Sequence, residues 1–461
     1  MQKAIAKYGL AAHLALLAVA PLVLFPYCGG ATIATVVLWL SLSAACWTLL
    51  EPSVRKGEML HDARRRVSLA IVRDPLFWTL LAVAVLVGLR ALNTGISIFY
   101  DYETRGWTVS PPFLEFLPGA MSDSGYLPFA AAVATTVLVV ACRHALGRSA
   151  RMAFLLVGSL AAGLSSSAAL YFACHGNAVA KAAMECGMGW SFRPGVAFAF
   201  YLLCSTVAAF GAFERKWSRA VPAVMLAIAG NAAGLFAFST PFEIVVFFGA
   251  DLVLFLFVFI CAWRKLHGTT DFKLLVVFAV SVMFGGLLVA AAMPDELLSA
   301  RLDAIIERKF FLPEFMDLRR VLSAVAFKVW AAHPWAGAGI GAFQFNMRFN
   351  LAAADWALVP RGIAAVPNGW WQLVAERGIV GAVLIALPVG FLAFTYLKRL
   401  VVGVRARELP GPSVLLAPLA LAALLAVTFF GCSLLRADVL MAMGAIFAVS
   451  AMSFPKKGMG K

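Results

Sequence analysis

The sequence predicts an all-α polytopic membrane protein, and three observations lead to this fold class. The chain of 461 residues is 62% hydrophobic and only 13% charged, whereas soluble globular proteins carry about 25% charged residues. Its mean hydropathy is +0.90. Apolar runs of roughly twenty residues, the length that a helix needs to cross a bilayer, recur along the whole chain.

About twelve of these runs are predicted to be transmembrane helices. The first, 9–28, has basic flanks at Lys3 and Lys7 but no convincing small-residue cleavage site, so we expect a first span rather than a removed signal peptide. The other predicted spans are 31–50, 76–93, 126–142, 152–173, 193–213, 220–238, 242–263, 272–292, 378–397, 413–432 and 439–454. The chain then divides into spans one to nine (1–292), a large loop (293–377) and spans ten to twelve (378–461).

The distribution of basic residues predicts the topology. If the N-terminus lies inside, 24 of the 38 basic residues and only seven acidic ones fall on the cytoplasmic side, as the positive-inside rule requires. The net charge of +15 is therefore expected to face membrane lipids and not nucleic acid. Both termini are predicted to be cytoplasmic. Two loops that are long enough to fold, 94–125 and 293–377, are predicted to lie outside.

The cysteines give no sign of a metal site. The eight cysteines are scattered, without a CxxC motif or a Cys/His ligand spacing, so we expect neither a metal nor a cofactor. Cys174 and Cys186 fall in one outside loop. They either form a disulfide or remain two free thiols.

The large loop has the pattern of folded structure. Residues 295–309 place Leu298, Leu302 and Ile305 at helical spacing, which predicts an amphipathic helix on the membrane surface. A second helix is expected from Pro313 to the proline after His333. Alternate glycines follow in "WAGAGIGAF" and permit a tight connection. No strand precedes them, which argues against a dinucleotide-binding fingerprint.

A polar stripe precedes the tenth span, in "VPNGWWQLVAERGIVGAVL". Asn368, Gln372 and Glu376 are four residues apart and share one face if this segment is helical. Trp370 and Trp371 lie beside the stripe. The segment is either a helix entering the bilayer through its aromatic belt or one wall of a site for a polar substrate at the membrane surface.

Several short motifs in the large loop occur in an order that resembles a known superfamily. An arginine, an apolar helix, a glycine-rich block and a later polar block cover about 315–385 and resemble the O-antigen ligase and O-antigen polymerase superfamily. The residues that match are Arg319, His333, Pro334, Gly337, Gly339, Gly341, Phe343, Asn368, Gln372, Glu376, Gly378 and Gly381.

The resemblance implies an integral membrane glycosyltransferase. Such proteins move a glycan from an undecaprenyl diphosphate carrier to an acceptor hydroxyl at the periplasmic face of the bacterial inner membrane. The implied partners are therefore the undecaprenyl-diphosphate-linked glycan, a glycan or lipid acceptor and membrane lipids. The large loop is then expected to be periplasmic.

Each candidate site residue has a functional and a structural interpretation. Arg319 and Arg320 are predicted to neutralise the diphosphate, or else pair with nearby carboxylates or headgroups, and Glu376 is the candidate base. Arg193 is a second phosphate candidate or an interfacial snorkelling residue.

The remaining candidates are expected to assist. Asn368, Gln372 and Trp371 are expected to order the loop or contact sugar. His333 ends a helix, where the dipole favours a cation, so a structural role is expected there.

The chain departs from the superfamily pattern at two places. Pro367 stands where the family has its proposed catalytic histidine, and 238–243 lacks the family's arginine. Three explanations are open: the base is Glu376, Glu243 or His175, the protein is a divergent polymerase with different acceptor chemistry, or it is a non-catalytic homologue that only binds a lipid-linked glycan.

A transporter or flippase of lipid-linked or amphipathic solutes is the alternative function. It is suggested by Asp251 in the eighth span, although Asn231 of the seventh span is expected to be able to pair with this carboxylate. Arg90, near the outer end of the third span, is open to either interpretation.

Overall fold

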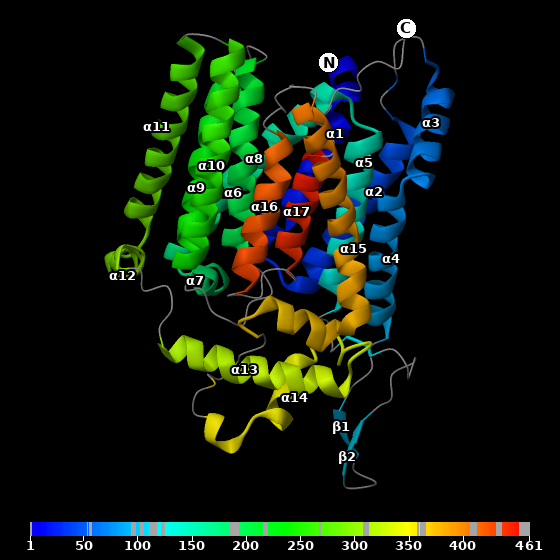
Figure 1. Cartoon of the computed structure of the whole chain (residues 1–461), viewed down its shortest axis with the longest axis vertical. Helices are drawn as coiled ribbons and strands as arrows, with labels where there is room; N and C mark the ends of the chain where they lie inside the picture. Colours follow the sequence, from blue (N-terminus) through cyan, green and yellow to red (C-terminus); the bar gives the residue numbers. More distant parts are fainter. Residues whose placement is uncertain are drawn as a thin grey trace.

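The structure is a computed structural model, and it describes residues 2–52, 54, 58–93, 98–101, 106–109, 118–120, 125–184, 193–214, 220–266, 269–307, 313–356, 359, 366–405, 413–429 and 436–450. Long helices run side by side as a bundle, and shorter ones lie across one end of it (Figure 1). The helices of the bundle are α1 (Gln2–Leu24), α2 (Gly30–Leu50), α4 (Pro75–Leu92), α5 (Tyr126–His144), α6 (Arg148–Cys174), α8 (Pro194–Glu214), α9 (Val221–Phe238), α10 (Pro241–Leu266), α11 (Thr269–Ala292), α15 (Gly369–Arg405), α16 (Ser413–Thr428) and α17 (Ala437–Ser450).

The bundle has the character of a membrane protein. Nine helices of the described part are long and apolar enough to cross a bilayer, while α1, α16 and α17 contain shorter apolar stretches. Large apolar side chains are exposed on the outer helices, for example Met283, Phe284 and Leu287 on α11, as expected for surfaces that face lipid rather than water. The fold is therefore a helical, multi-pass membrane type. The count of twelve spans stays a prediction.

The smaller predicted outside loop departs from the all-helical expectation. Within the described residues, β1 (Ile98–Asp101) and β2 (Gly106–Val109) form an antiparallel hairpin. These strands contain aromatic and β-branched residues, which favour extended structure. Because the hairpin is only two short strands, the helical fold class holds.

The helices α6 and α9 approach each other closely at glycine residues. A Cβ atom on Gly230 would lie 2.2 Å from the carbonyl oxygen of Gly163, and the Ser166 hydroxyl donates to the Gly230 carbonyl. Small residues allow such backbone approach, which drives association between helices in a bilayer.

Two polar interactions inside the bundle differ from expectation. Asp251 accepts a hydrogen bond from the Thr206 hydroxyl at 2.8 Å, so the predicted pairing with Asn231 is wrong. Asn231 donates instead to the carbonyls of Ser159 and Ala227, because its own helix and α6 are nearer. The thiol of Cys174 contacts the Ala292 carbonyl at 2.7 Å, and Cys186 lies outside the described residues.

The two expected helices of the large loop are present as α12 (Asp295–Ile306) and α13 (Pro313–Ala332). The structure adds α14 (Phe343–Asn350) and the 3-10 helix η3 (Ala353–Asp355), which the sequence did not predict. A second hydrophobic core joins α13, α14 and residues 366–375 through Leu322, Phe343 and Ala375, among others. We call α13, α14 and residues 366–377 the cap.

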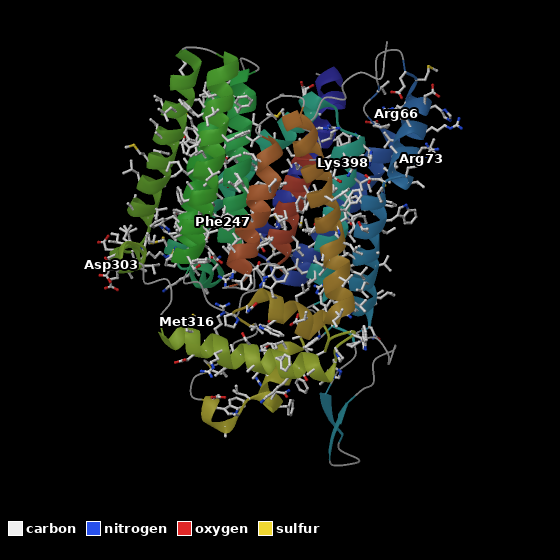
Figure 2. All side chains as sticks on the ribbon, viewed as in Figure 1. Arg66, Arg73, Phe247, Asp303, Met316 and Lys398 are labelled. Atoms are coloured by element: carbon white, nitrogen blue, oxygen red, sulfur yellow. The ribbon has the colours of Figure 1, made fainter. Side chains whose placement is uncertain are left out.

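The cap and the N-terminus lie at opposite ends of the bundle (Figure 1). Figure 2 shows Arg66 and Arg73 toward the N-terminal end, whereas Asp303 and Met316 lie toward the cap. The short helices α3 (Leu60–Val72) and α7 (Ala178–Met184) lie at these two ends respectively (Figure 1). The orientation of these two ends in the membrane stays a prediction.

Candidate functional site

The polar stripe lies on a helical segment that runs across the end of the bundle. Gly378 has φ 64° and ψ −173°, so α15 is two helices joined at a sharp kink. Residues 369–377 lie transverse to the bundle and belong to the cap, while the rest of α15 runs along the other long helices (Figure 1). The predicted tenth span, which begins at residue 378, therefore starts at the kink.

Gln372 and Glu376 share one face of this segment, as predicted, whereas Asn368 lies just before its first helical residue. The Asn368 side chain accepts hydrogen bonds from the Trp370 and Trp371 amides at 3.1 and 3.4 Å and so caps the transverse segment. Gln372 Nε2 donates to Glu376 Oε1 at 2.6 Å, and Gln372 Oε1 accepts from the Val366 amide at 2.6 Å. Gln372 is therefore the residue that orients the Glu376 carboxyl group.

Glu376 is a buried acid with several polar neighbours. Only 5% of the residue is exposed. Its carboxyl group accepts a backbone hydrogen bond from Gly341 and lies in the electrostatic field of Arg377 and Arg436. Carboxylates with donors fixed around them are held in one orientation, which suits a group that must accept a proton from a bound hydroxyl.

The glycine run of the loop holds the kink of α15. The Ala338 and Gly339 amides donate to the last carbonyls of the transverse segment, those of Ala375 and Glu376, at 2.8 and 3.0 Å. The first amides after the kink, of Ile379 and Val380, donate to the Pro334 and Trp335 carbonyls at 2.9 and 3.1 Å. Both interrupted helix ends are thereby satisfied.

Close approach explains why glycine is needed in this connection. A Cβ atom on Gly337 would lie 2.4 Å from the Glu376 carbonyl carbon, and one on Gly378 would lie 2.2 Å from the Trp335 carbonyl oxygen. Both residues have positive φ. The prediction of a tight connection packed against the membrane domain is confirmed.

Arg90 of α4 is the third component of this junction. It is only 1% exposed, and its guanidinium donates to the carbonyls of Ala336, at 2.6 Å, and Glu376, at 3.2 Å. Arginine can bridge two backbone oxygens because its donors form a planar fork. The sequence left the role of Arg90 open. In the structure its side chain links α4 of the bundle to the glycine run and the transverse segment.

A chain of alternating charges runs from Glu376 along the cap-facing end of the bundle. Arg436 interacts electrostatically with both Glu376 and Asp438. Asp438 Oδ2 accepts the Arg193 amide at 2.8 Å, and Arg193 Nη1 lies 3.9 Å from Glu243 Oε1. These residues come from the cap-facing ends of α8, α10, α15 and α17, which converge there.

An apolar groove lies between α4, α5, α15 and α17. Its walls include Val83, Leu440 and Phe447, and the one charged side chain among the described residues that line it is Arg377. Arg377 directly follows Glu376. A buried carboxylate, several guanidinium groups and an apolar groove between spanning helices therefore lie in this region.

The remaining predicted site residues lie elsewhere in the cap. Arg319 and Arg320 are on α13, half-buried and exposed respectively, and neither lines the groove. Burial lowers the pKa of the Arg319 guanidinium. The functions predicted for the two arginines stay predictions.

Trp371, His333 and His175 have local packing roles. The Trp371 ring packs edge-on against Phe327 of α13, with centroids 5.8 Å apart. His333 is exposed just after the end of α13, and its carbonyl accepts the Gly337 amide at 2.9 Å. The role predicted for its side chain stays a prediction. His175 stacks on Tyr171 at 4.0 Å.

Sequence reasoning missed Arg436 and Asp438 and gave Arg377 no role of its own. The signal available was the pair of opposite charges in "LLRADVL", directly before an apolar run. Intramembrane or membrane-edge charges are functional candidates by default. Only the structure shows that Arg436 acts on Glu376 and also on Asp438.

No protein-family model matches the chain, and the search of curated proteins gave no match either. Among the described residues, no group of three or more His, Cys, Asp and Glu side chains could hold a metal ion. The geometry of the site is therefore the main guide to its chemistry.

Proposed function

We propose that the protein is a membrane glycosyltransferase that moves a glycan from an undecaprenyl diphosphate carrier to an acceptor hydroxyl, as O-antigen ligases and polymerases do. The observation that carries this proposal is Glu376: a buried carboxylate, oriented by Gln372, that directly precedes Arg377, a lining residue of an apolar groove between spanning helices. The motif order in 315–385 supports the same conclusion.

The chemistry follows from the residues around Glu376. The carboxylate takes the proton of the acceptor hydroxyl, whose oxygen attacks the anomeric carbon of the lipid-linked sugar. The bond from that carbon to the diphosphate oxygen breaks, and arginines at the membrane surface neutralise the leaving diphosphate. Pro367 is buried at the start of the transverse segment, so Glu376 takes the place of the missing histidine in this scheme.

The proposal also assigns a compartment and an orientation. The protein spans the bacterial inner membrane with both termini in the cytoplasm and the cap in the periplasm. The basic residues at the end opposite the cap support this orientation, and the acceptor is a glycan or lipid on the same outer surface.

Transfer in vitro is the direct test. Purified protein in lipid nanodiscs is incubated with undecaprenyl-diphosphate-linked oligosaccharide, with and without lipid A core or a second lipid-linked oligosaccharide as acceptor. We expect a product only when an acceptor is present, and expect it to be lost in Glu376→Gln. Absence of product with every acceptor, from protein that retains its thermal unfolding transition, contradicts the proposal.

Asp251 favours a second candidate function, transport of a lipid-linked or amphipathic solute. Its Oδ2 atom is buried without a hydrogen-bond partner among the described residues, which is costly inside a membrane. Under this alternative, Asp251→Asn abolishes solute movement across vesicle membranes while Glu376→Gln does not. The converse pattern in the transfer assay favours the glycosyltransferase.

A further inference from the structure

The smaller predicted outside loop reaches the glycine run of the large loop through residues 118–120, which we call the strap. Ala120 is 2% exposed and forms a buried apolar cluster with Val87 of α4 and Ile340 of the glycine run. Such contacts fix a segment on its neighbours, because exposing the apolar surface again costs free energy. The strap therefore packs against both the bundle and the glycine run.

Backbone contacts fix the strap on both sides. Toward the bundle, the Ala120 amide donates to the Arg90 carbonyl at 2.9 Å. Toward the glycine run, Ala120 and Ile340 form a parallel β-bridge. A Cβ atom on Gly339 would lie 2.3 Å from the Gly119 carbonyl oxygen. Gly339 has φ 110°, so this close approach of the two loops requires glycine.

The two residues that the strap contacts most closely also hold the last carbonyl before the kink in α15. The Glu376 carbonyl accepts hydrogen bonds from the Gly339 amide at 3.0 Å and from the Arg90 guanidinium at 3.2 Å. A reacting group must be held within a fraction of an ångström of its productive position. Whatever fixes these two donors therefore also fixes the place of the Glu376 carboxyl group.

We propose that the strap positions Glu376. It keeps Gly339 and Arg90 in place, and these two residues hold the Glu376 carbonyl, so that the attached carboxyl group keeps the orientation that proton transfer requires. The inference rests on the proposed function, in which Glu376 is the base. It makes the two predicted outside loops, which are far apart in the sequence, one functional unit.

Ala120→Leu displaces the strap while leaving Glu376 and its hydrogen-bond partners unchanged. The larger side chain overpacks the space beside Val87 and Ile340, and overpacking of a buried site shifts the backbone. Ala120→Val makes the same change on a smaller scale and carries the comparison if Ala120→Leu does not fold. Ala63→Leu is the matched control, because Ala63 is also buried but belongs to α3, at the end of the bundle opposite the cap (Figure 1).

Hydrogen exchange and the steady-state kinetics of glycan transfer are measured on each purified full-length variant in lipid nanodiscs. In Ala120→Leu we expect faster exchange of the amides of 337–342 and 376–380, because their local opening becomes easier. We expect kcat to fall by about tenfold or more, since a misplaced catalytic group loses rate. The KM for the lipid-linked donor should change by less than about twofold, because donor binding is not altered. Ala63→Leu should keep the wild-type exchange in both segments and both kinetic constants.

Three results overturn the assignment. One is wild-type exchange at both segments in the folded Ala120 variants. Another is a higher KM at unchanged kcat, which identifies a substrate-binding role for the strap. The third is the same increase in exchange in Ala63→Leu, which identifies general destabilisation. Faster exchange at 376–380 in Ala120→Leu, together with no transfer by the wild type with any acceptor, sinks the proposed reaction and leaves the strap as the element that orders the backbone at Glu376.

Discussion

Glu376 is the residue on which the proposed chemistry depends. Glu376→Gln preserves the shape of the side chain and a partner for Gln372 but removes the proton acceptor. We expect the initial rate of glycan transfer to fall by about 100-fold or more, the usual contribution of a general base. Glu296→Gln, on exposed α12, serves as the control and should retain the wild-type rate. An unaltered rate in Glu376→Gln assigns the base to another group.

Arg90 illustrates a buried charge whose role is structural. Arg90→Met removes the donor to the Ala336 and Glu376 carbonyls, and each buried acceptor left unsatisfied costs about 1–3 kcal/mol. We expect a clear decrease in the melting temperature of the purified protein, with Arg320→Met on the exposed side of α13 showing little change. If Arg90→Met melts at the same temperature as the wild type, the two carbonyls do not depend on the guanidinium for stability.

Asp74, at the end of the bundle opposite the cap, contributes to the stability of the fold in a way that depends on pH. Burial raises its pKa, but the hydrogen bond with His144, the charge of Arg143 and the Leu76 amide outweigh this effect, so the pKa lies below its ordinary value of 3.8. A carboxyl group with a lowered pKa stabilises the fold above the pKa it has when unfolded, and this stability is lost as the pH falls.

The corresponding measurement compares wild type and Asp74→Asn across pH. We expect the variant to melt at a lower temperature at neutral pH, with the difference shrinking as the pH falls toward and below 3.8, because the wild-type carboxylate then becomes protonated. A difference that stays constant with pH contradicts the assigned charge interaction.

At the scale of the elements, the kink in α15 is the feature that turns the polar stripe toward the bundle. The backbone of Gly378, at φ 64° and ψ −173°, lies in a region that is essentially restricted to glycine. A straight continuation of α15 would leave the stripe on the spanning helix instead of between the bundle and α13 (Figure 1).

Gly378→Ala tests this element. The new Cβ would lie 2.2 Å from the Trp335 carbonyl oxygen, and backbone strain adds about 1–3 kcal/mol. We expect a lower melting temperature and a loss of transfer, while Gly390→Ala on the same helix should keep both. Hydrogen exchange at 369–380 should increase in Gly378→Ala alone, and unchanged exchange there argues against the kink as the source of the effect.

For the whole molecule, the main prediction concerns orientation in the membrane. Phe349 on α14 is 73% exposed and His61 on α3 is also exposed. In a background without native cysteines, a membrane-impermeant maleimide should label Phe349→Cys in cells whose outer membrane alone is permeable. His61→Cys should react only after the inner membrane is disrupted, and the reverse pattern contradicts a periplasmic cap.

Features that depend on residues close together in the sequence could be predicted, and features that depend on distant residues could not. The amphipathic pattern of 295–306, the α13 boundaries and the shared face of Gln372 and Glu376 depend on neighbours within a few residues, so they are visible in the sequence. The pairing of Asp251 with Thr206 was missed because its two residues are 45 positions apart. The hairpin was missed because its strands are only four residues long.

The sequence by itself determined the helical membrane class and the location of the polar stripe before an apolar run. These properties follow from hydropathy and periodicity, which are local. Only the tertiary structure decided that Arg90, 286 positions away, holds the Glu376 carbonyl and that Arg377 faces a groove built from four helices. Such contacts depend on how helices pack, because hydropathy specifies that a residue is buried but not which residue lies beside it.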